Sequence, residues 1–175
     1  MNIDKIMEFM NKKEIVSVYS NLTDTTKFCT GIVLGISEEH LLIAHVTPKG
    51  MYDGIMLKKL ENIYRVDFGG RYEEKIRRLL NNESFKNYTI LNNNLMEYVL
   101  TYSKNNKLII TVEINDSNYD DVQGIVEEVA DDTVLIKCVT EYGEIEGSTI
   151  ICIKDITHLV CDSEDEQILK TLAKI

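Results

Sequence analysis

The residues of this chain that could do chemistry are few and widely spaced. Its 4 cysteines and 3 histidines form no group with the spacing of a zinc site or of an activated nucleophile. Isolated thiols without a C-x-x-C pair are typical of reduced cysteines buried in a cytoplasmic protein. The sequence therefore predicts no metal site and a cytoplasmic location. The cysteines are Cys29, Cys138, Cys152 and Cys161.

The motifs of common enzyme classes are also missing. The sequence has no G-x-x-x-x-G-K-[ST] phosphate loop, no G-x-S-x-G elbow, no H-E-x-x-H pair and no dinucleotide fingerprint. We interpret the Gly69-Gly70 pair as a flexible exit from a strand. Acidic runs at 127–128, 131–132 and 164–166 lack the ligand order of a calcium loop and are interpreted as solvated turns. We therefore expect no catalytic residues and no cofactor.

Charge divides the chain into two unlike parts. The net charge is −10, and positions 1–82 hold 12 Lys/Arg and 11 Asp/Glu whereas positions 83–175 hold 7 and 18. Clustered Lys and Arg normally bind phosphate backbones, so DNA is not an expected partner and any RNA contact would use the first part. The basic cluster there is Arg71, Lys75, Arg77 and Arg78. Its alternative interpretation is a helix face balanced at i,i+4 spacing, with Glu73 opposite Arg77 and Glu74 opposite Arg78.

The strongest signal is an internal repeat with an offset of 93 residues. The run Gly31-Ile-Val33 returns as Gly124-Ile-Val126, and Gly54 returns as Gly147. Over positions 1–82, 12 of 82 residues are identical at this offset, against about 5 expected from ordinary composition. The identities fall at glycines and apolar strand positions, where backbone freedom and core packing restrict the residue type. One supersecondary unit is therefore built twice.

Each copy is predicted to contain a helix, five short strands and a closing helix. Ile3, Ile6, Met7 and Met10 share one face of the first helix, and runs of β-branched and aromatic residues predict the strands. In the first copy we expect helices at 3–11 and 72–80, and strands at 14–20, 28–36, 41–47, 54–60 and 63–68.

The second copy follows the same order after a polar connector. Six asparagines lie between 81 and 94, so we expect a first domain at 1–80, a connector at 81–94 and an acidic second domain at 95–175. The second copy opens with a helix at 95–102. Its last helix begins with a capping box at 163–166, and the apolar face of that helix is expected to hold Ile168, Leu169 and Leu172.

This pattern resembles the Sm/Lsm family of small β-barrels. The first Sm motif is matched by Phe28-Cys-Thr-Gly31-Ile-Val33 with Leu41 and Ile43, and the second by Gly54, Ile63 and Val66. In the second copy the second motif is matched by Gly147, Ile156 and Leu159. The resemblance implies a mostly β, α+β protein with two tandem five-stranded Sm-like barrels, each with N-terminal and C-terminal helical segments.

The resemblance carries the family's RNA site over only in part. Sm proteins that bind RNA use an Asn in the first motif and an Arg-Gly in the second. The corresponding residues here are His40 and Lys59 in the first copy, but Thr133 and Cys152 in the second. The resemblance therefore implies a possible RNA contact in the first copy alone, through His40 and Lys59, with Arg71 and Arg78 from the basic cluster.

Two functions follow from these observations. The favoured one is a non-catalytic interaction or regulatory module, in which the acidic second barrel contacts protein or the chain self-associates through barrel edge strands. The alternative is an RNA-binding protein that uses the first barrel. No apolar run is long enough to span a bilayer, so no membrane partner is expected. His45 and Cys138, which are equivalent in the repeat, are interpreted as ordinary strand residues.

Overall fold

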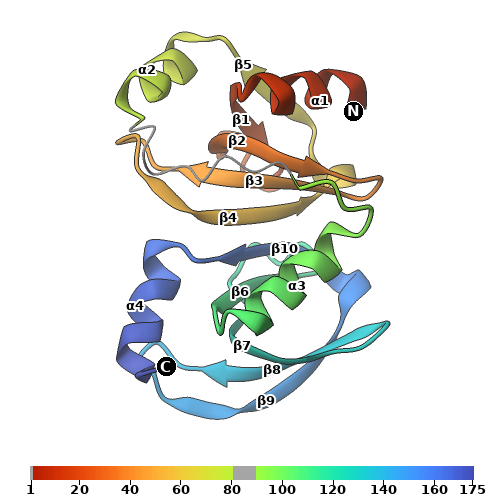
Figure 1. Cartoon of the computed structure of the whole chain (residues 1–175), viewed down its shortest axis with the longest axis vertical. Coiled ribbons are helices and arrows are strands. Elements are labelled where there is room, and N and C mark those ends of the chain that lie inside the picture. Colours follow the sequence, from red (N-terminus) through yellow and green to blue (C-terminus); the bar gives the residue numbers. More distant parts are fainter. Residues whose placement is uncertain (1, 81–89) are drawn as a thin grey trace. The chain divides into compact units, whose positions relative to one another are not determined.

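The chain folds into two compact units, Met1–Leu95 and Met96–Ile175, seen in a computed structural model that describes residues 2–80 and 90–175 (Figure 1). Both units are mostly β-structure with short helices, so the α+β class is confirmed. Within the described residues, no helix is both long enough and apolar enough to cross a membrane.

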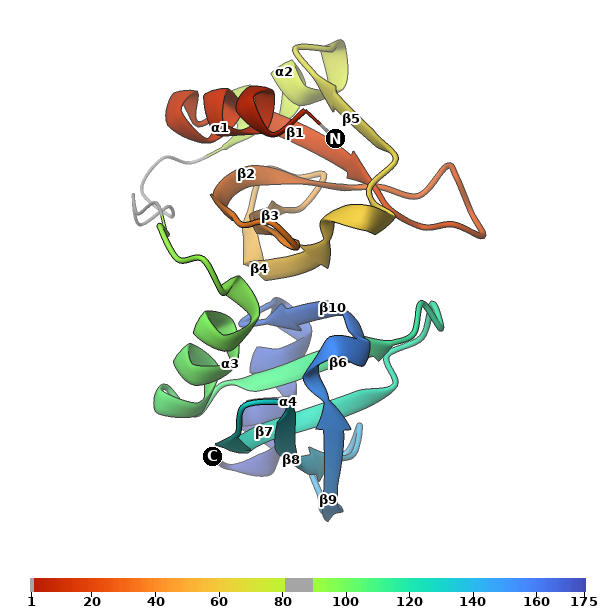
Figure 2. The same ribbon diagram turned by 90° about the vertical axis from the view of Figure 1, so that its right-hand side faces the viewer.

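The first unit contains five antiparallel strands and two α-helices. It begins with helix α1, and a second helix, α2, follows the last strand (Figures 1 and 2). A 3-10 turn, η1, lies between the last two strands. The elements are α1 Ile3–Lys12, β1 Ile15–Tyr19, β2 Cys29–Ile36, β3 His40–Val46, β4 Tyr52–Lys59, η1 Leu60–Asn62, β5 Arg65–Phe68 and α2 Arg71–Leu79.

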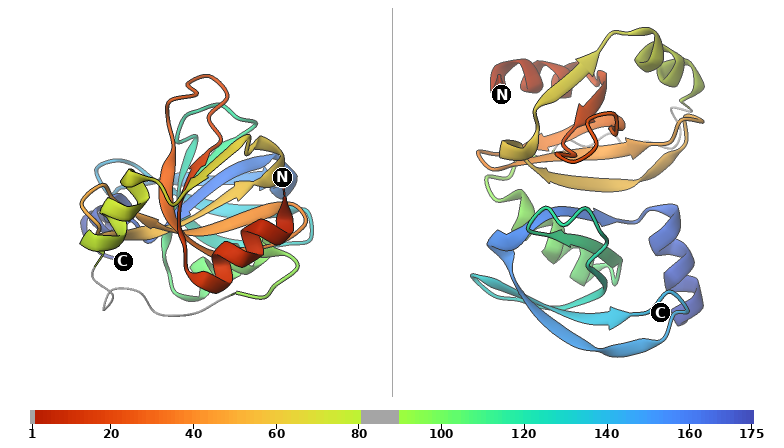
Figure 3. Two further views of the ribbon diagram at one scale, coloured as in Figure 1. Left: turned by 90° about the horizontal axis from the view of Figure 1, so that it is seen from above. Right: turned by 180° about the vertical axis from the view of Figure 1, so that it is seen from behind.

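The second unit repeats this order. Helix α3 opens it, a 3-10 turn again precedes the last strand, and α4 closes it (Figure 3). The elements are α3 Leu95–Asn105, β6 Ile109–Ile114, β7 Val122–Val129, β8 Thr133–Val139, β9 Ile145–Cys152, η3 Ile153–Asp155, β10 Ile156–Cys161 and α4 Glu164–Ala173.

The strand order is the same in both units and is open. In the first unit it is β5-β1-β2-β3-β4, and in the second β10-β6-β7-β8-β9. In the described residues no ladder joins β4 to β5 or β9 to β10, so the expected closure into barrels is not confirmed. The second strand of each unit carries a register shift at equivalent places, between Val33 and Gly35 and between Val126 and Glu128.

Glycine is required where the second and third strands approach each other. A Cβ built on Gly31 would clash with the backbone carbonyl of Ala44, and one on Gly124 would clash with that of Lys137. Both clashes involve backbone, which cannot move without opening the ladder. The sequence suggested backbone freedom as the reason for these repeated glycines, but neither has a positive φ, and the close approach of the neighbouring strand is what requires them.

The repeat is not free of insertions over its whole length. Ile15 pairs with Ile32 in the first unit, and Ile109 pairs with Ile125 in the second. The offset is therefore 94 residues at the first strand but 93 at the second, because the β1–β2 connection is one residue longer than its copy. The single offset of 93 residues inferred from the sequence was therefore wrong for the segment before β2.

Each helix covers its own part of the apolar core. In the first unit, α1 buries Ile6, Phe9 and Met10 against strand residues that include Val16, Val33 and Ile43. The predicted face was partly wrong, because Ile3 and Met7 are exposed and Phe9 is buried. Helix α2 buries Ile76 in a separate cluster with Ile15, Ile32 and Val46. The second unit repeats that cluster with Leu169 of α4, Ile109 and Val139, whereas Ile168 and Leu172 are exposed.

A buried glutamate fastens the closing helix of each unit to its first strand. Glu73, only 4% exposed, accepts hydrogen bonds from the Ser17 hydroxyl at 2.6 Å and from the Gly70 N–H at 3.1 Å. Glu166 likewise accepts from the Thr111 hydroxyl at 2.7 Å and the Ser163 N–H at 2.9 Å. The predicted capping box at 163–166 is thus confirmed.

The predicted helix pairs at i,i+4 were half right. Arg78 donates to Glu74 at 2.9 Å, as expected. The pair of Glu73 with Arg77 was wrong, because Glu73 turns inward to Ser17 and Arg77 donates to Glu14 at 2.5 Å. Most of the expected connector, residues 81–89, lies outside the described residues. Its last part is joined to the first unit, because Ile90 is buried and its N–H donates to the Leu34 carbonyl at 2.8 Å.

Candidate functional site

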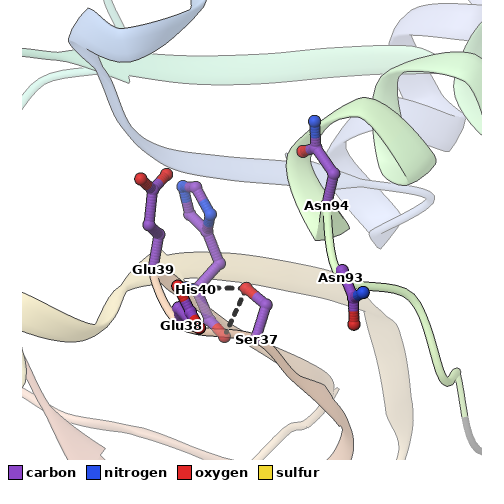
Figure 4. A pocket seen from close by; sticks show the side chains of 6 residues that line it. All are labelled: Ser37, Glu38, Glu39, His40, Asn93 and Asn94. Atoms are coloured by element: carbon purple, nitrogen blue, oxygen red, sulfur yellow. Dashed lines mark hydrogen bonds between the residues drawn. The ribbon is translucent and has the colours of Figure 1, made fainter.

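A pocket of about 460 Å³ lies at the β2–β3 turn of the first unit. The turn itself is held by Ser37, whose N–H donates to the His40 carbonyl at 2.9 Å and whose hydroxyl oxygen accepts from the His40 N–H at 3.1 Å. The Leu60 N–H donates to the Glu39 carbonyl at 2.8 Å and ties the turn to η1. The pocket is lined by Ser37, Glu38, Glu39, His40, Asn93 and Asn94 (Figure 4).

His40 is the buried polar group of this pocket. The residue is 6% exposed, and its Nε2 atom has no hydrogen-bond partner among the described residues. Burial lowers the pKa of His40 below the ordinary value of 6.5, because a charged imidazolium is poorly solvated there. The ring is therefore neutral at pH 7. Figure 4 shows it beside the side chain of Glu39.

The structure brings two of the four predicted RNA-contact residues together. His40 and Lys59 are direct cross-strand partners on β3 and β4. The Lys59 side chain is largely covered, with its ammonium 3.9 Å from the Glu61 carboxylate. Glu38 and Glu39 also line the pocket. A phosphate bound here would therefore meet one lysine and the carboxylates of Glu38, Glu39 and Glu61. Its chemistry suits a neutral hydrogen-bonding group better than a phosphate.

The other two predicted residues belong to the closing helix. Arg71 is the first residue of α2, and Arg78 lies near its end. Arg78 is exposed and pairs with Glu74 at 2.9 Å, as a balanced helix face requires. His40 and Lys59 therefore lie together on neighbouring strands, whereas Arg71 and Arg78 lie on α2.

Sequence reasoning missed a row of aromatic rings on the first unit. The ring centroids of Tyr64 and Tyr19 are 6.4 Å apart, those of Tyr19 and Phe28 are 5.1 Å apart, and those of Phe28 and Tyr72 are 5.3 Å apart. We call these four residues the aromatic row. They come from β1, α2 and the connections that precede β2 and β5, so no linear motif contains them.

Two cations border the aromatic row. The Arg65 guanidinium lies 4.5 Å from the centre of the Tyr19 ring, and the Lys75 ammonium lies 5.9 Å from that of Tyr72. Arg65 also donates to both carboxylate oxygens of Asp67, at 2.8 and 2.6 Å. This bidentate bond holds the pKa of Asp67 below its ordinary value. The Tyr19 hydroxyl donates to the same carboxylate at 3.2 Å, which fixes the ring in place.

His45 and Cys138, the equivalent pair of the repeat, have different surroundings. His45 Nδ1 lies 3.1 Å from the Asp53 carboxylate, and both side chains are largely buried. The Cys138 thiol instead donates to the carbonyl of Ile136, at 3.9 Å. Across the described residues, no group of three or more His, Cys, Asp or Glu side chains is arranged to hold a metal ion.

Comparison with known proteins identifies no relative: no family model, curated protein or solved structure matches this chain.

Proposed function

We propose that this chain is a non-catalytic, Sm-like interaction module that associates with protein, in the first instance with itself, through its sheet edges. The observation that carries the proposal is the end strand β9. It runs for eight residues, Ile145–Cys152, and its ladder in the described residues is with β8. Unpaired strand edges invite pairing with another chain.

The residues of β9 favour an edge that is covered by a partner chain. Natural proteins protect an exposed edge with lysine, proline or a very short strand. β9 contains no lysine and no proline, and Ile150 is 71% exposed. A long edge strand with exposed apolar side chains, here Ile145 and Ile150, is a place where another chain can pair.

The first unit offers a different edge. β5, at one end of the strand order of that unit, is four residues long and pairs with β1. By the repeat, β5 is the fifth strand of the first copy, whereas β9 is the fourth strand of the second. Pairing β9 of one chain with β5 of the next would join unlike surfaces, and such contacts produce rings or open chains. The tandem Sm-like fold, which the element order and the repeated glycines support, is part of this proposal.

The test is the association state of an edge variant. Ile150→Lys places a charge on β9, and Ile168→Lys, on the exposed side of α4, is the matched control. We expect the wild type and Ile168→Lys to associate with rising concentration in sedimentation velocity, and Ile150→Lys to lose association with an unchanged circular dichroism spectrum. A wild type that stays monomeric at its solubility limit would contradict the proposal.

RNA binding by the first unit is the second candidate. The cross-strand pairing of His40 with Lys59 favours it, because these are the two residues that the Sm resemblance implies. Fluorescence anisotropy with labelled short RNA at low and physiological salt is the test, since phosphate contacts weaken steeply with salt. Binding that is salt-dependent and lost in Lys59→Glu supports this function, and no binding at low salt rules it out.

A further inference from the structure

Two rings of the aromatic row remain partly exposed to solvent after packing within their own unit. Phe28 is 41% exposed, and Tyr64 is exposed to a similar degree. The rings are held by their neighbours, since the Tyr64 hydroxyl donates to the Asn21 carbonyl at 3.2 Å and Phe28 meets Tyr72 edge to face. Rigid aromatic side chains lose little conformational entropy on binding, and they are enriched at the centres of protein interfaces.

The second unit carries acids at three of the four equivalent places. Tyr19 corresponds to Glu113, because Tyr19 pairs with Arg65 and Glu113 pairs with His158 in the matching ladders. By the offset of 93, the other three rings of the row, Phe28, Tyr64 and Tyr72, correspond to Asp121, Thr157 and Asp165. The glycines and core residues of the two copies are kept while this surface differs, which indicates that the two units present it to different partners.

The acidic surface also presents one large ring to solvent. Tyr119 is 75% exposed in the connection between β6 and β7, next to Asp120 and Asp121. Figure 2 shows this connection, in green to teal, projecting beyond the two strands. We call residues 115–121 the acidic loop.

The acidic loop has a fixed conformation. The Asp121 carboxylate accepts from the Ile114 N–H at 2.7 Å and from the Ser117 hydroxyl at 2.5 Å. The Tyr119 N–H in turn donates to the Ser117 hydroxyl oxygen at 3.1 Å, and the Asn118 N–H donates to Glu113 at 2.9 Å. A loop that is already ordered loses little entropy when it binds.

We propose that the aromatic row of one chain binds the acidic loop of a second copy. The fit is chemical: the Tyr119 ring meets exposed aromatic rings, and the Asp120 carboxylate meets the Lys75 ammonium at the border of the row. The contact joins unlike surfaces of two chains, so it is head-to-tail. It uses side chains of the loop and the row, and it strengthens association in addition to strand pairing through β9.

Two variants test the contact, one on each side of it. Phe28→Asp inserts into the row the residue that the second unit carries at the equivalent position, where the fold accommodates it. Tyr119→Lys removes the ring from the acidic loop and reverses the local charge. Tyr142→Lys is the matched control, because Tyr142 is 73% exposed in another loop of the same unit.

The decisive measurement is complementation in sedimentation velocity. We expect Phe28→Asp and Tyr119→Lys each to weaken association about tenfold or more, while Tyr142→Lys behaves as wild type. Mixed in equal amounts, the two variants should restore a one-to-one dimer, since each mutant supplies the surface that the other lacks. High salt should weaken that dimer.

Three results would overturn the proposal. If both variants associate as the wild type does, association runs through the strand edges alone, and the proposed function survives without this contact. If the mixture stays monomeric, the two surfaces are not partners. If short single-stranded RNA binds the wild type and Tyr119→Lys equally but not Phe28→Asp, the row is a base-stacking surface and its occupant is RNA.

Discussion

Replacing Glu73 by alanine tests the link between the closing helix and the first strand. The change removes a buried carboxylate that accepts from the Ser17 hydroxyl at 2.6 Å and from the Gly70 N–H at 3.1 Å. A hydrogen bond to a charged group contributes about 1.5–3 kcal/mol. Ser17 keeps a second hydroxyl, that of Thr30, at 3.3 Å, and Gly70 is exposed and can bind water. These alternative partners of Ser17 and Gly70 reduce the stability that is lost with the carboxylate. We expect Glu73→Ala to reduce the free energy of unfolding by about 2–3 kcal/mol.

The assay is urea unfolding followed by circular dichroism, because the chain has no tryptophan. Glu74→Ala is the control on the same helix, since it breaks only exposed pairs with Arg77 and Arg78 and should cost less than about 1 kcal/mol. Hydrogen exchange shows whether the loss is confined to the first unit. Glu166→Ala should reproduce the effect in the second unit, where Thr111 and Ser163 donate to the carboxylate.

A double-mutant cycle gives the outcome that would refute this reasoning. If Ser17 and Glu73 interact as their distance implies, Ser17→Ala should cost much less in the Glu73→Ala background than in the wild type. Additive losses, or a Glu73→Ala variant as stable as Glu74→Ala, would show that the buried bond does not hold the helix to the strand.

Three further predictions concern single buried or crowded groups. Burial raises the pKa of the Cys161 thiol to about 12. Native protein treated with iodoacetamide at mildly alkaline pH should therefore be modified at the exposed Cys152 and not at Cys161. The stability that the neutral Cys161 thiol contributes should be lost as pH rises above 9 toward 12. Because burial lowers the pKa of His40, its contribution to stability is present above pH 6.5 and is lost as pH falls through the lowered pKa, so urea midpoints should fall less on acidification in His40→Gln than in the wild type. Gly31→Ala should destabilise the first unit by several kcal/mol through a clash with backbone. Gly69→Ala, which has open space around it but φ +66°, should cost about 1 kcal/mol. Equal midpoints of the two variants in thermal unfolding would contradict the packing of β2 on β3.

Much of the fold could be predicted because its signals are local. The strand predicted at 28–36 is Cys29–Ile36, and the helix predicted at 72–80 is Arg71–Leu79. Periodicity and β-branched residues specify elements over a few turns of chain, and Ser163 with Glu166 marks a helix start within four residues. The repeat was equally visible, since Gly31 and Gly124 have the same steric requirement.

The errors arose where the partner of a residue is distant in sequence. Glu73 has the i,i+4 spacing for a pair with Arg77, but a strand hydroxyl 56 positions earlier takes its carboxylate. The register difference before β2 escaped notice because the identities that define the repeat all lie at or after Gly31. The aromatic row was missed for the same reason: its members come from separate segments, and only the paired ladders bring Tyr19 beside Arg65.

The sequence by itself determined the element order, the duplication, the unequal charge of the two copies and the positions of the repeated glycines. These properties depend on backbone conformation and residue type within short segments. Only the tertiary structure decided that His40 is buried beside Lys59, that Glu73 faces Ser17 and that four rings form one row with Arg65. Such contacts depend on strand register and on which face each helix turns inward, and both are set by packing between segments that are far apart along the chain.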